Sequence, residues 1–538
     1  MSFKIKNKFL FLGILYVFSC LVGLLVLTYI WLPPGFTLAG HDSGLPLDAK
    51  QFLQTRLFAW DDRLGFGLDN SANFGSLTIH FFDWLSSVIG GTPYAGNYIA
   101  IFFWLGLIFV SSFFFAYQLK DIFGKPFVFI LPVFLTFNFY IFQSVFMLER
   151  AKFGVFSATL ISLAVFLRMQ DKKLPIVASA IISALTFSIF NGGGWFGVTL
   201  YGGVAIILIA LIFTSFAEGL ISHNFYNLKR TCIFLALSVI FYLLFNAYSI
   251  LSYLQNFLSN DVPRLLQESS MGSHKDWLRY VSRSTSFLNL FRLFGVPDWY
   301  GEINDLNKIN LSHPYAFIYL NNKILVIISF IFPILSFASF LLAKTKKQKQ
   351  ILSLFGLITL IELIFAAGSN SPFGFFYEFL MDHIPGFILF RSAFYKFGIF
   401  YMFGMMVMFS FTVSFLIEKL VDKIRKGTNY WIENITSFLL LLLVLGLWLS
   451  YHFVLFNPQK VFNWKTDQST KVKLPEYIFD FAKWVEKSNL EEKRILLLPP
   501  VNSDWQNDAY NWGYWSLSPL PYALTSARVL SNWHGLTS

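Results

Sequence analysis

The chain has 538 residues, of which 56% are hydrophobic, 20% aromatic and only 13% charged. A soluble globular protein of this length could not cover its surface with so few polar side chains, so the composition indicates an integral membrane protein. The formal net charge of +11 does not indicate a nucleic-acid partner, because the lysines and arginines fall mostly in short loops between apolar runs. The two cysteines, Cys20 and Cys232, are expected at different depths and predict no disulfide.

About eleven apolar runs of membrane-spanning length follow one another, which predicts an all-α polytopic membrane protein. The cations gather in alternate loops, so the positive-inside rule predicts a multi-pass protein of the plasma (inner) membrane with a cytoplasmic N-terminus and an extracytoplasmic C-terminus. The predicted spans are 9–32, 98–118, 126–146, 153–168, 174–190, 196–216, 231–251, 323–343, 351–367, 393–416 and 436–456.

Most of the length outside the membrane falls on the predicted outer side. Residues 1–456 are predicted to form the multispan domain, and 457–538 a small α/β or β extracytoplasmic segment that reads as the start of a larger domain. In this last segment, 474–488 has a helical pattern and 494–498 a strand-like one. Long loops without repeats are usually functional. The outer loops are predicted at 33–97, 252–322 and 368–392.

The first outer loop opens with an acid, Asp42, directly after the first span. An acid held just outside a bilayer is suitably placed to act as the general base of an enzyme working on a lipid-linked substrate. The alternative is an ordinary loop acid that caps the amphipathic helix expected at 51–60. Asp48 fits that cap better, because it lies just before the helix. Further on, Asp61 is expected in a solvated turn, and Asn70 either contacts sugar hydroxyls or forms part of a polar turn.

Charged residues at three further outer positions are candidates for binding a substrate. In the hairpin before residue 153, Arg150 or Lys152 could hold a lipid phosphate and Glu149 could supply a second carboxylate, or the three could form a self-neutralising salt bridge. Near the entrance of the span at 393–416, Arg391 and Lys396 are predicted to bind phosphate, and the alternative is that they simply snorkel to the membrane surface. The second outer loop interleaves aromatic and basic residues suited to sugar and phosphate, or to lipid headgroups: Trp277, Arg279 and Arg283.

Landmarks in a fixed order run through nearly the whole chain. Together they resemble the membrane α-(1→3)-arabinofuranosyltransferase family of GT-C glycosyltransferases. They are Asp42-Ser43-Gly44, Phe52-Leu53, Trp60, Gly65-Phe66-Gly67, Asn70, Trp277-Leu278, Thr285-Ser286, Leu389-Phe390-Arg391, Tyr395-Lys396-Phe397, Leu497-Leu498-Pro499 and Tyr510-Asn511-Trp512-Gly513.

The resemblance implies an inverting transfer of a sugar, arabinofuranose or another, from a polyprenyl-phosphate donor to a cell-envelope glycan on the outer face. It implies that Asp42 is the base and that Arg391 and Lys396 hold the lipid phosphate. No cofactor is expected, and a divalent cation is not indicated. The expected partners are the lipid-linked donor, the glycan acceptor and membrane lipid. Two other functions stay open: a transporter or flippase for a lipid-linked glycan, for which Glu362 is the acid found well inside a span, and a non-catalytic assembly protein.

Overall fold

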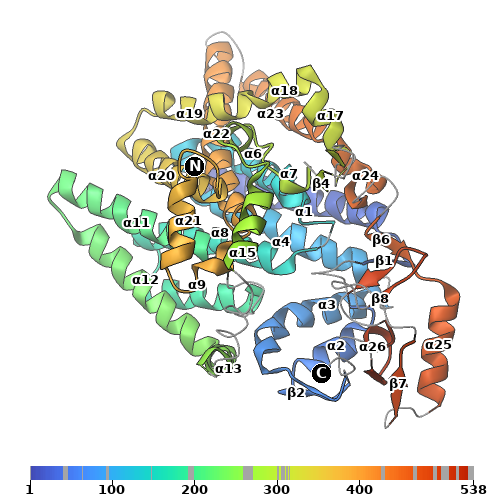
Figure 1. Ribbon diagram of the computed structural model, residues 1–538. Helices are drawn as coiled ribbons and strands as arrows, with labels where there is room; N and C mark the ends of the chain where they lie inside the picture. Colours follow the sequence, from blue (N-terminus) through green and yellow to red (C-terminus); the bar gives the residue numbers. More distant parts are fainter. Residues whose placement is uncertain are drawn as a thin grey trace.

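The computed structural model is a bundle of long helices with smaller elements gathered at one end (Figure 1). Nine helices of the described chain are long and apolar enough to cross a membrane, and Ile176–Phe190 and Ile435–Tyr451 are shorter apolar helices. Each coincides with a predicted span, so the prediction of an all-α polytopic membrane protein is confirmed. The structure describes residues 2–39, 46–63, 65–91, 96–146, 148–191, 199–258, 271–299, 302–303, 309–310, 313, 315–425, 430–463, 469–488, 493–498, 508–516 and 520–530.

The apolar runs fold into single helices, or into pairs of helices where the run is interrupted. The run after Lys125 breaks behind Thr136, where Asn138 caps the next helix by accepting hydrogen bonds from the backbone N–H groups of Tyr140 and Ile141, each at 3.0 Å. The bundle helices are α1 (Ser2–Trp31), α4 (Gly96–Gln118), α6 (Lys125–Thr136), α7 (Phe139–Phe142), α8 (Arg150–Gln170), α9 (Ile176–Asn191), α11 (Tyr201–Ser222), α12 (Tyr226–Phe245), α18 (Lys323–Ser329), α19 (Ile331–Leu342), α20 (Lys346–Ala366), α22 (Ala393–Arg425) and α23 (Tyr430–Tyr451).

Helix α22 is the central helix of the bundle. Of its most apolar stretch, 89% is buried inside the protein, against 11% for α1 and 17% for α12. A helix that is apolar all round and buried is a core element, whereas an apolar helix left exposed must face lipid. The exposed apolar side chains of α1 and α12, such as Phe11, Phe18 and Leu244, therefore form part of the membrane-facing surface.

The short loops rich in cations meet at one end of the bundle, which we call the basic end. Lys347 pairs with Asp171 at 3.0 Å, and the amide of Gln348 donates to the carbonyl of Ile122 at 2.7 Å. Glu418, at the far end of α22, accepts a hydrogen bond from the backbone N–H of Lys125. These contacts join four loops that the charge pattern had assigned to one side of the membrane, so the predicted alternation of the loops is confirmed.

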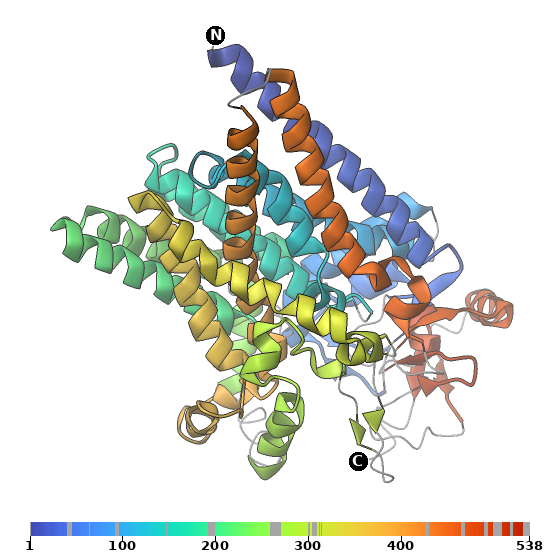
Figure 2. The same cartoon turned by 90° about the horizontal axis from the view of Figure 1, so that it is seen from above.

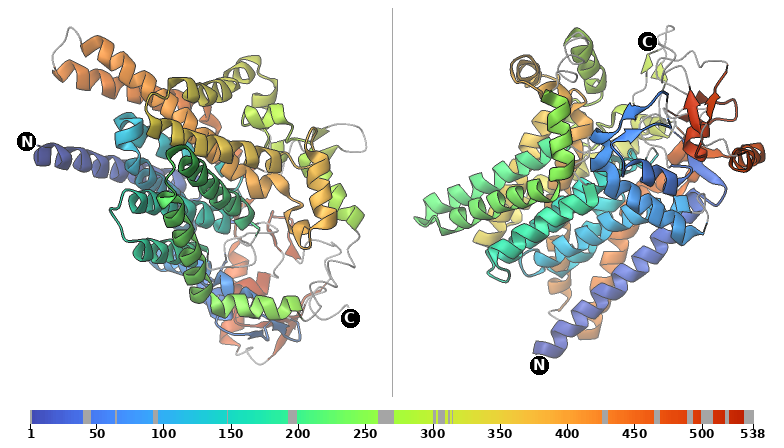
Figure 3. Two further views of the ribbon diagram at one scale, coloured as in Figure 1. Left: turned by 90° about the vertical axis from the view of Figure 1, so that its left-hand side faces the viewer. Right: turned by 90° about the horizontal axis from the view of Figure 1, so that it is seen from below.

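The longer connecting segments gather at the opposite end, which we call the loop end (Figures 2 and 3). The C-terminal segment is not separate from the first loop, because β1 pairs antiparallel with β6 and the backbone N–H of Val529 donates to the carbonyl of Arg63 at 2.7 Å. Its predicted helix and strand are present as α25 and β7. The elements here are β1 (Phe36–Leu38), α2 (Ala49–Thr55), β2 (Trp60–Asp61), β3 (Leu68–Asp69), η1 (Ser71–Ser76), α3 (Leu77–Gly90), α13 (Ala247–Leu258), α15 (Met271–Ser282), α16 (Phe287–Phe291), η2 (Pro297–Trp299), β4 (Glu302–Ile303), β5 (Ile309–Asn310), α17 (Ala316–Asn321), α21 (Gly374–His383), η3 (Phe387–Phe390), η4 (Phe453–Phe456), α24 (Pro458–Phe462), β6 (Lys471–Lys473), α25 (Glu476–Lys487), β7 (Arg494–Leu496), β8 (Asp508–Ala509), β9 (Trp515–Ser516), α26 (Leu520–Leu524) and β10 (Arg528–Leu530).

Two predictions for the acids of the first loop are decided by its packing. Asp48 caps α2, since its carboxylate accepts from the backbone N–H of Gln51 at 3.0 Å, as predicted. The helix ends at Thr55, earlier than expected. The solvated turn predicted at Asp61 is wrong: Asp61 is buried and accepts a hydrogen bond from the Tyr522 hydroxyl at 2.7 Å. A buried carboxylate needs such a donor.

Gly154 is a close-packing point between α8 and α9, and Gly154→Ala should destabilise the bundle. A β-carbon there would lie 2.1 Å from the carbonyl oxygen of Phe190, so one of the helices must shift. Such overpacking costs about 1–3 kcal/mol. The matched control is Gly23→Ala in α1, where a β-carbon meets nothing within 4 Å. Thermal unfolding in detergent should show a lower midpoint for Gly154→Ala alone, and equal midpoints would contradict this account of the packing.

Candidate functional site

Two of the three charged residues in the hairpin before α8, Lys152 and Glu149, are paired with each other. Lys152 is 5% exposed, and its ammonium group donates to the Ser144 hydroxyl at 2.8 Å and pairs closely with the Glu149 carboxylate. The self-neutralising pair is therefore what the structure shows for these two residues. A buried cation already paired with an acid is poorly placed to hold a phosphate, so the phosphate-binding prediction for Lys152 and the substrate-binding prediction for Glu149 do not fit their surroundings.

The third charged residue of the hairpin, Arg150, forms an ion pair with a different acid. Its guanidinium pairs closely with Asp83 on α3, whose side chain is 2% exposed. His80, one turn earlier on α3, places Nδ1 3.2 Å from the same carboxylate oxygen. Burial lowers the pKa of His80 to about 4, so the imidazole is neutral near pH 7 and Arg150 supplies the positive charge. The other oxygen of Asp83 is buried and accepts no hydrogen bond from the described residues.

The hairpin lies against the entrance of α22, where Lys396 is found. The Lys152 ammonium is 5.4 Å from the centre of the Tyr395 ring, the residue before Lys396. Lys396 is half-buried on the first turn of that helix. The structure thus brings together the hairpin and the α22 entrance, two of the three predicted parts of the site. The third part, Asp42, lies outside the described residues, and its role stays a prediction.

The described neighbours of the Asp42 segment are fixed close to the same hairpin. The backbone N–H of Ala39 donates to the carbonyl of Thr470 at 2.8 Å, and the hydroxyl of Thr470 donates to the carbonyl of Phe146 at 2.7 Å. On the other flank, the N–H of Asp48 donates to the carbonyl of Ala523 at 3.1 Å. Ala39 is therefore linked through Thr470 to the hairpin.

Arg391 differs from Arg150 and Lys152 because no acid among the described residues neutralises it. It follows η3 directly and is half-buried, and its side chain has no hydrogen bond or ion pair with any residue that the structure describes. Burial lowers the pKa of Arg391, which is the direction expected when a charge is desolvated without a counter-ion. An anion bound here would supply the missing negative charge.

Helix α15 covers the side of this arginine. The indole N–H of Trp277 donates to the hydroxyl of Ser392 at 2.8 Å. Burial lowers the pKa of His274, and the nearby positive charge of Arg391 lowers it further. Trp277 therefore lies next to the residue that follows the cation and is 45% exposed, and its predicted contact with substrate stays a prediction.

Three of the predicted substrate-binding residues contact other residues of the chain. Arg279 pairs with Glu378 on α21 at 3.2 Å, and Arg283 lies exposed over the Tyr280 ring at 5.1 Å. Asn70 is 3% exposed, and its amide accepts from Arg56 at 2.8 Å while donating to the carbonyl of Phe58 at 3.2 Å. Asn70 thus holds the first loop together, and its predicted contact with sugar does not fit a buried and fully bonded amide.

Within the described residues, no group of three or more histidine, cysteine, aspartate or glutamate side chains lies close enough to hold a metal ion. Asp83 is the part of this site that sequence reasoning missed, because nothing in the run around it marks the acid as the partner of Arg150, 67 positions away.

Comparison with known proteins adds a similarity of fold. No protein-family model matches the sequence, and no curated protein matches it. Among solved structures, the cryo-EM structure of the arabinofuranosyltransferase AftD from Mycobacteria superimposes with a TM-score of 0.57 at 13% identity, covering 96% of this chain and 31% of that one. A mutant of AftD gives a TM-score of 0.50 at 12% identity. The chain thus has the fold of part of AftD and spans about a third of its length.

Proposed function

We propose that this chain is an integral-membrane glycosyltransferase that moves a sugar from a polyprenyl-phosphate donor to a hydroxyl of a cell-envelope glycan. The observation that carries the proposal is Arg391, a half-buried cation with no acid partner among the described residues, at the loop end of a fold shared with an arabinofuranosyltransferase. A phosphate monoanion or dianion is the group that such a guanidinium binds best. The basic end would then face the cytoplasm and the loop end the outer side of a plasma membrane, as the positive-inside rule predicts.

The proposed reaction is a single inverting displacement at the anomeric carbon. Asp42 accepts the proton of the acceptor hydroxyl, whose oxygen then forms a bond to the anomeric carbon. The bond from that carbon to the phosphate oxygen breaks on the opposite face, and the electron pair leaves with polyprenyl phosphate. The leaving group gains a negative charge, which Arg391 stabilises, with Lys396 at the same helix entrance. In this scheme Arg150, whose charge is neutralised by Asp83, helps to position the hairpin and is not assigned to the phosphate.

The alternative of a transporter draws its support from Glu362. This acid is fully buried in α20, and neither carboxylate oxygen has a partner among the described residues. Ionisable residues inside membrane helices often belong to transport pathways. A pathway also needs further ionisable groups in series, however, and the partly buried cation and the acids discussed above lie at the loop end. We therefore favour glycosyl transfer.

The test is turnover by the purified full chain with a panel of polyprenyl-phosphate sugars, arabinofuranose among them, and an envelope glycan as acceptor. We expect transfer from at least one lipid-linked donor and none from the corresponding nucleotide sugar, because in this proposal the leaving group stabilised by Arg391 is polyprenyl phosphate. Movement of an intact lipid-linked glycan across a vesicle membrane without transfer would overturn the proposal in favour of the transporter.

A further inference from the structure

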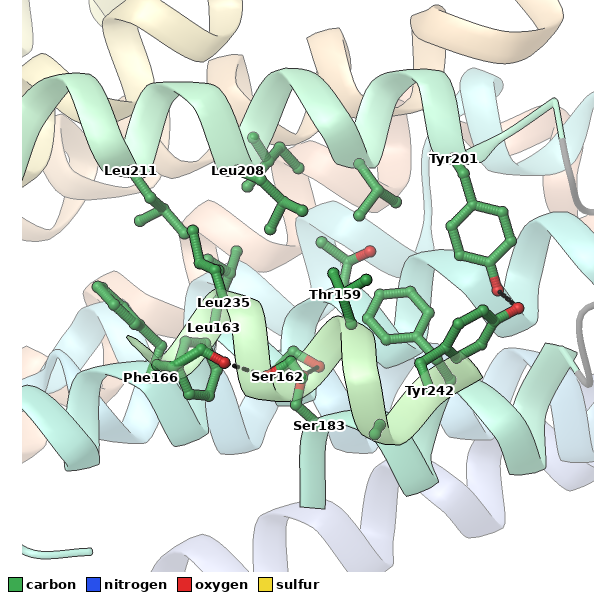
Figure 4. A pocket seen from close by; sticks show the side chains of 17 residues that line it. Thr159, Ser162, Leu163, Phe166, Ser183, Tyr201, Leu208, Leu211, Leu235 and Tyr242 are labelled. Atoms are coloured by element: carbon green, nitrogen blue, oxygen red, sulfur yellow. Dashed lines mark hydrogen bonds between the residues drawn. The ribbon is translucent and has the colours of Figure 1, made fainter. Parts of the chain in front are cut away.

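An apolar cavity lies between four helices of the bundle, away from the charged site. It is lined by α8, α9, α11 and α12 and has a volume of about 140 Å³ (Figure 4). Its walls are mostly aliphatic and aromatic, with Leu163, Phe166, Val204, Leu208 and Leu235 among the lining residues. Apolar cavities of this size stay dry and readily take up an apolar guest, as an engineered cavity of about 150 Å³ takes up benzene.

The few polar groups in the wall are already satisfied by the protein. The hydroxyls of Tyr201 and Tyr242 bond to each other at 2.9 Å, and those of Ser162 and Ser183 at 2.7 Å, as Figure 4 shows. A polar ligand would leave its own hydrogen bonds unmade in such a site, whereas a hydrocarbon loses nothing by entering. The chemistry of the wall therefore selects a hydrocarbon.

One wall of the cavity belongs to the membrane-facing surface. Val239 on α12 lines the cavity and is also 47% exposed. Since α12 is an outer helix of the bundle, a chain lying in the bilayer can reach the cavity past Val239 without crossing the protein.

One lining residue of the cavity, Tyr201, lies next to a contact with the segment that carries Arg391. Tyr201 lines the cavity at the first turn of α11, and the next residue, Gly202, packs so tightly on η3 that a β-carbon there would lie 2.5 Å from the Phe390 ring. Phe390 directly precedes Arg391. The arginine and the cavity are thus joined through one helix-to-helix contact, with the cation at one end and the hydrocarbon site at the other.

We propose that this cavity receives an isoprene unit of the donor's polyprenyl chain while Arg391 holds the donor's phosphate. The inference rests on the proposed function for the identity of the phosphate. A five-carbon branched unit is close in size to the guest that such a cavity accepts. An unbranched acyl chain of an anionic phospholipid is the competing occupant, because its headgroup phosphate would also pair with the arginine, and the first test distinguishes the two.

The first test measures occupancy and does not depend on turnover. The full chain in membranes is labelled with a photoreactive polyprenyl phosphate that carries its diazirine in the chain. We expect labelled peptides from α8, α9, α11 or α12, competed by unmodified polyprenyl phosphate and not by phosphatidylglycerol. Labelling confined to other helices would overturn the cavity proposal. If phosphatidylglycerol competes with the label as well as unmodified polyprenyl phosphate does, the cavity is an acyl-chain site instead.

The second test blocks the cavity with a larger side chain. Leu208→Trp fills it, and the matched control Ile209→Trp adds the same ring to the adjacent position of α11, which is 59% exposed and does not line the cavity. We expect Leu208→Trp alone to lose about tenfold in labelling and in kcat/KM for a long-chain donor. Leu208→Ala enlarges the cavity and should keep both the labelling and the kcat/KM for the long-chain donor. It shows whether a change at position 208 acts by blocking the cavity and not by disturbing the fold.

Chain length separates this inference from the proposed function. Leu208 lies two turns, or roughly 10 Å, along α11 from Tyr201, so a donor with a single isoprene unit cannot reach it. Leu208→Trp should therefore leave turnover of that short donor unchanged. If both variants use the long-chain donor equally, the cavity proposal fails and glycosyl transfer stands. If the wild-type chain uses neither donor yet is labelled in these helices, the lipid site stands and the proposed reaction fails.

Discussion

Replacing Asp42 by asparagine should reduce sugar transfer by about 10²- to 10⁴-fold in kcat, the range that a positioned general base contributes. Asparagine keeps the size and shape of the side chain but cannot accept a proton from the incoming hydroxyl. The donor affinity should change little, because in our proposal the phosphate is held by Arg391 and not by this acid. The measurement is kcat and KM of the purified variant with the donor that the wild-type chain uses.

Asp48→Asn provides the matched control, because it makes the same substitution six positions later in the same loop. The Asp48 carboxylate caps α2 by accepting from Gln51 at 3.0 Å, and asparagine is an equally good N-cap. That variant should keep both its stability and its turnover. Full activity in Asp42→Asn, or equal losses in the two variants, would remove Asp42 from its role as base.

Hydropathy and charge pattern were enough to predict the transmembrane architecture, because both depend on short stretches of sequence. A run of about 20 apolar residues satisfies the thickness of the bilayer wherever it occurs in the chain. The cations of the intervening loops then assign sides, and the pair formed by Lys347 and Asp171 shows that two of these loops do meet. Neither inference requires knowing which helix packs on which.

Contacts between distant segments of the chain could not be predicted in the same way. The sequence around Asp61 is polar and reads as a solvated turn, and only the return of the C-terminal segment, which brings Tyr522 to it across 461 positions, buries the acid. Likewise Asp83 meets Arg150 because α3 folds back against the start of α8. Such pairings depend on tertiary packing, which leaves no local signature in a single sequence.

The cations predicted to bind phosphate looked alike in the sequence, and burial separates them. Lys152 has Glu149 three positions earlier on its own helix turn, so its neutralisation could be suspected from spacing alone. Arg391 has no such neighbour. Its isolation is visible only once α15 and η3 are folded around it, since Asp382 and Glu378 nearby are engaged by Lys275 and Arg279.

Arg391→Gln should therefore weaken catalysis without weakening the fold. Loss of a charged hydrogen bond to phosphate costs about 1.5–3 kcal/mol, which corresponds to roughly 10- to 150-fold in kcat/KM. Stability should stay the same or rise, because a desolvated guanidinium without an acid partner among the described residues is replaced by a neutral amide. The kcat/KM of Arg391→Lys should fall between those of the wild-type chain and Arg391→Gln. An ammonium keeps the positive charge but cannot bond in the bidentate manner of a guanidinium.

A nearby basic residue that does have an acid partner is the control for Arg391. Lys275 pairs with Asp382 at 2.7 Å on the same side of the loop end, and an exposed pair of this kind contributes at most about 1 kcal/mol. Lys275→Gln should keep its turnover. A lowered unfolding midpoint in Arg391→Gln together with unchanged kcat/KM would mean that the arginine supports the fold. A drop in kcat/KM at an unchanged or higher midpoint is the behaviour of a residue whose missing counter-ion is the substrate.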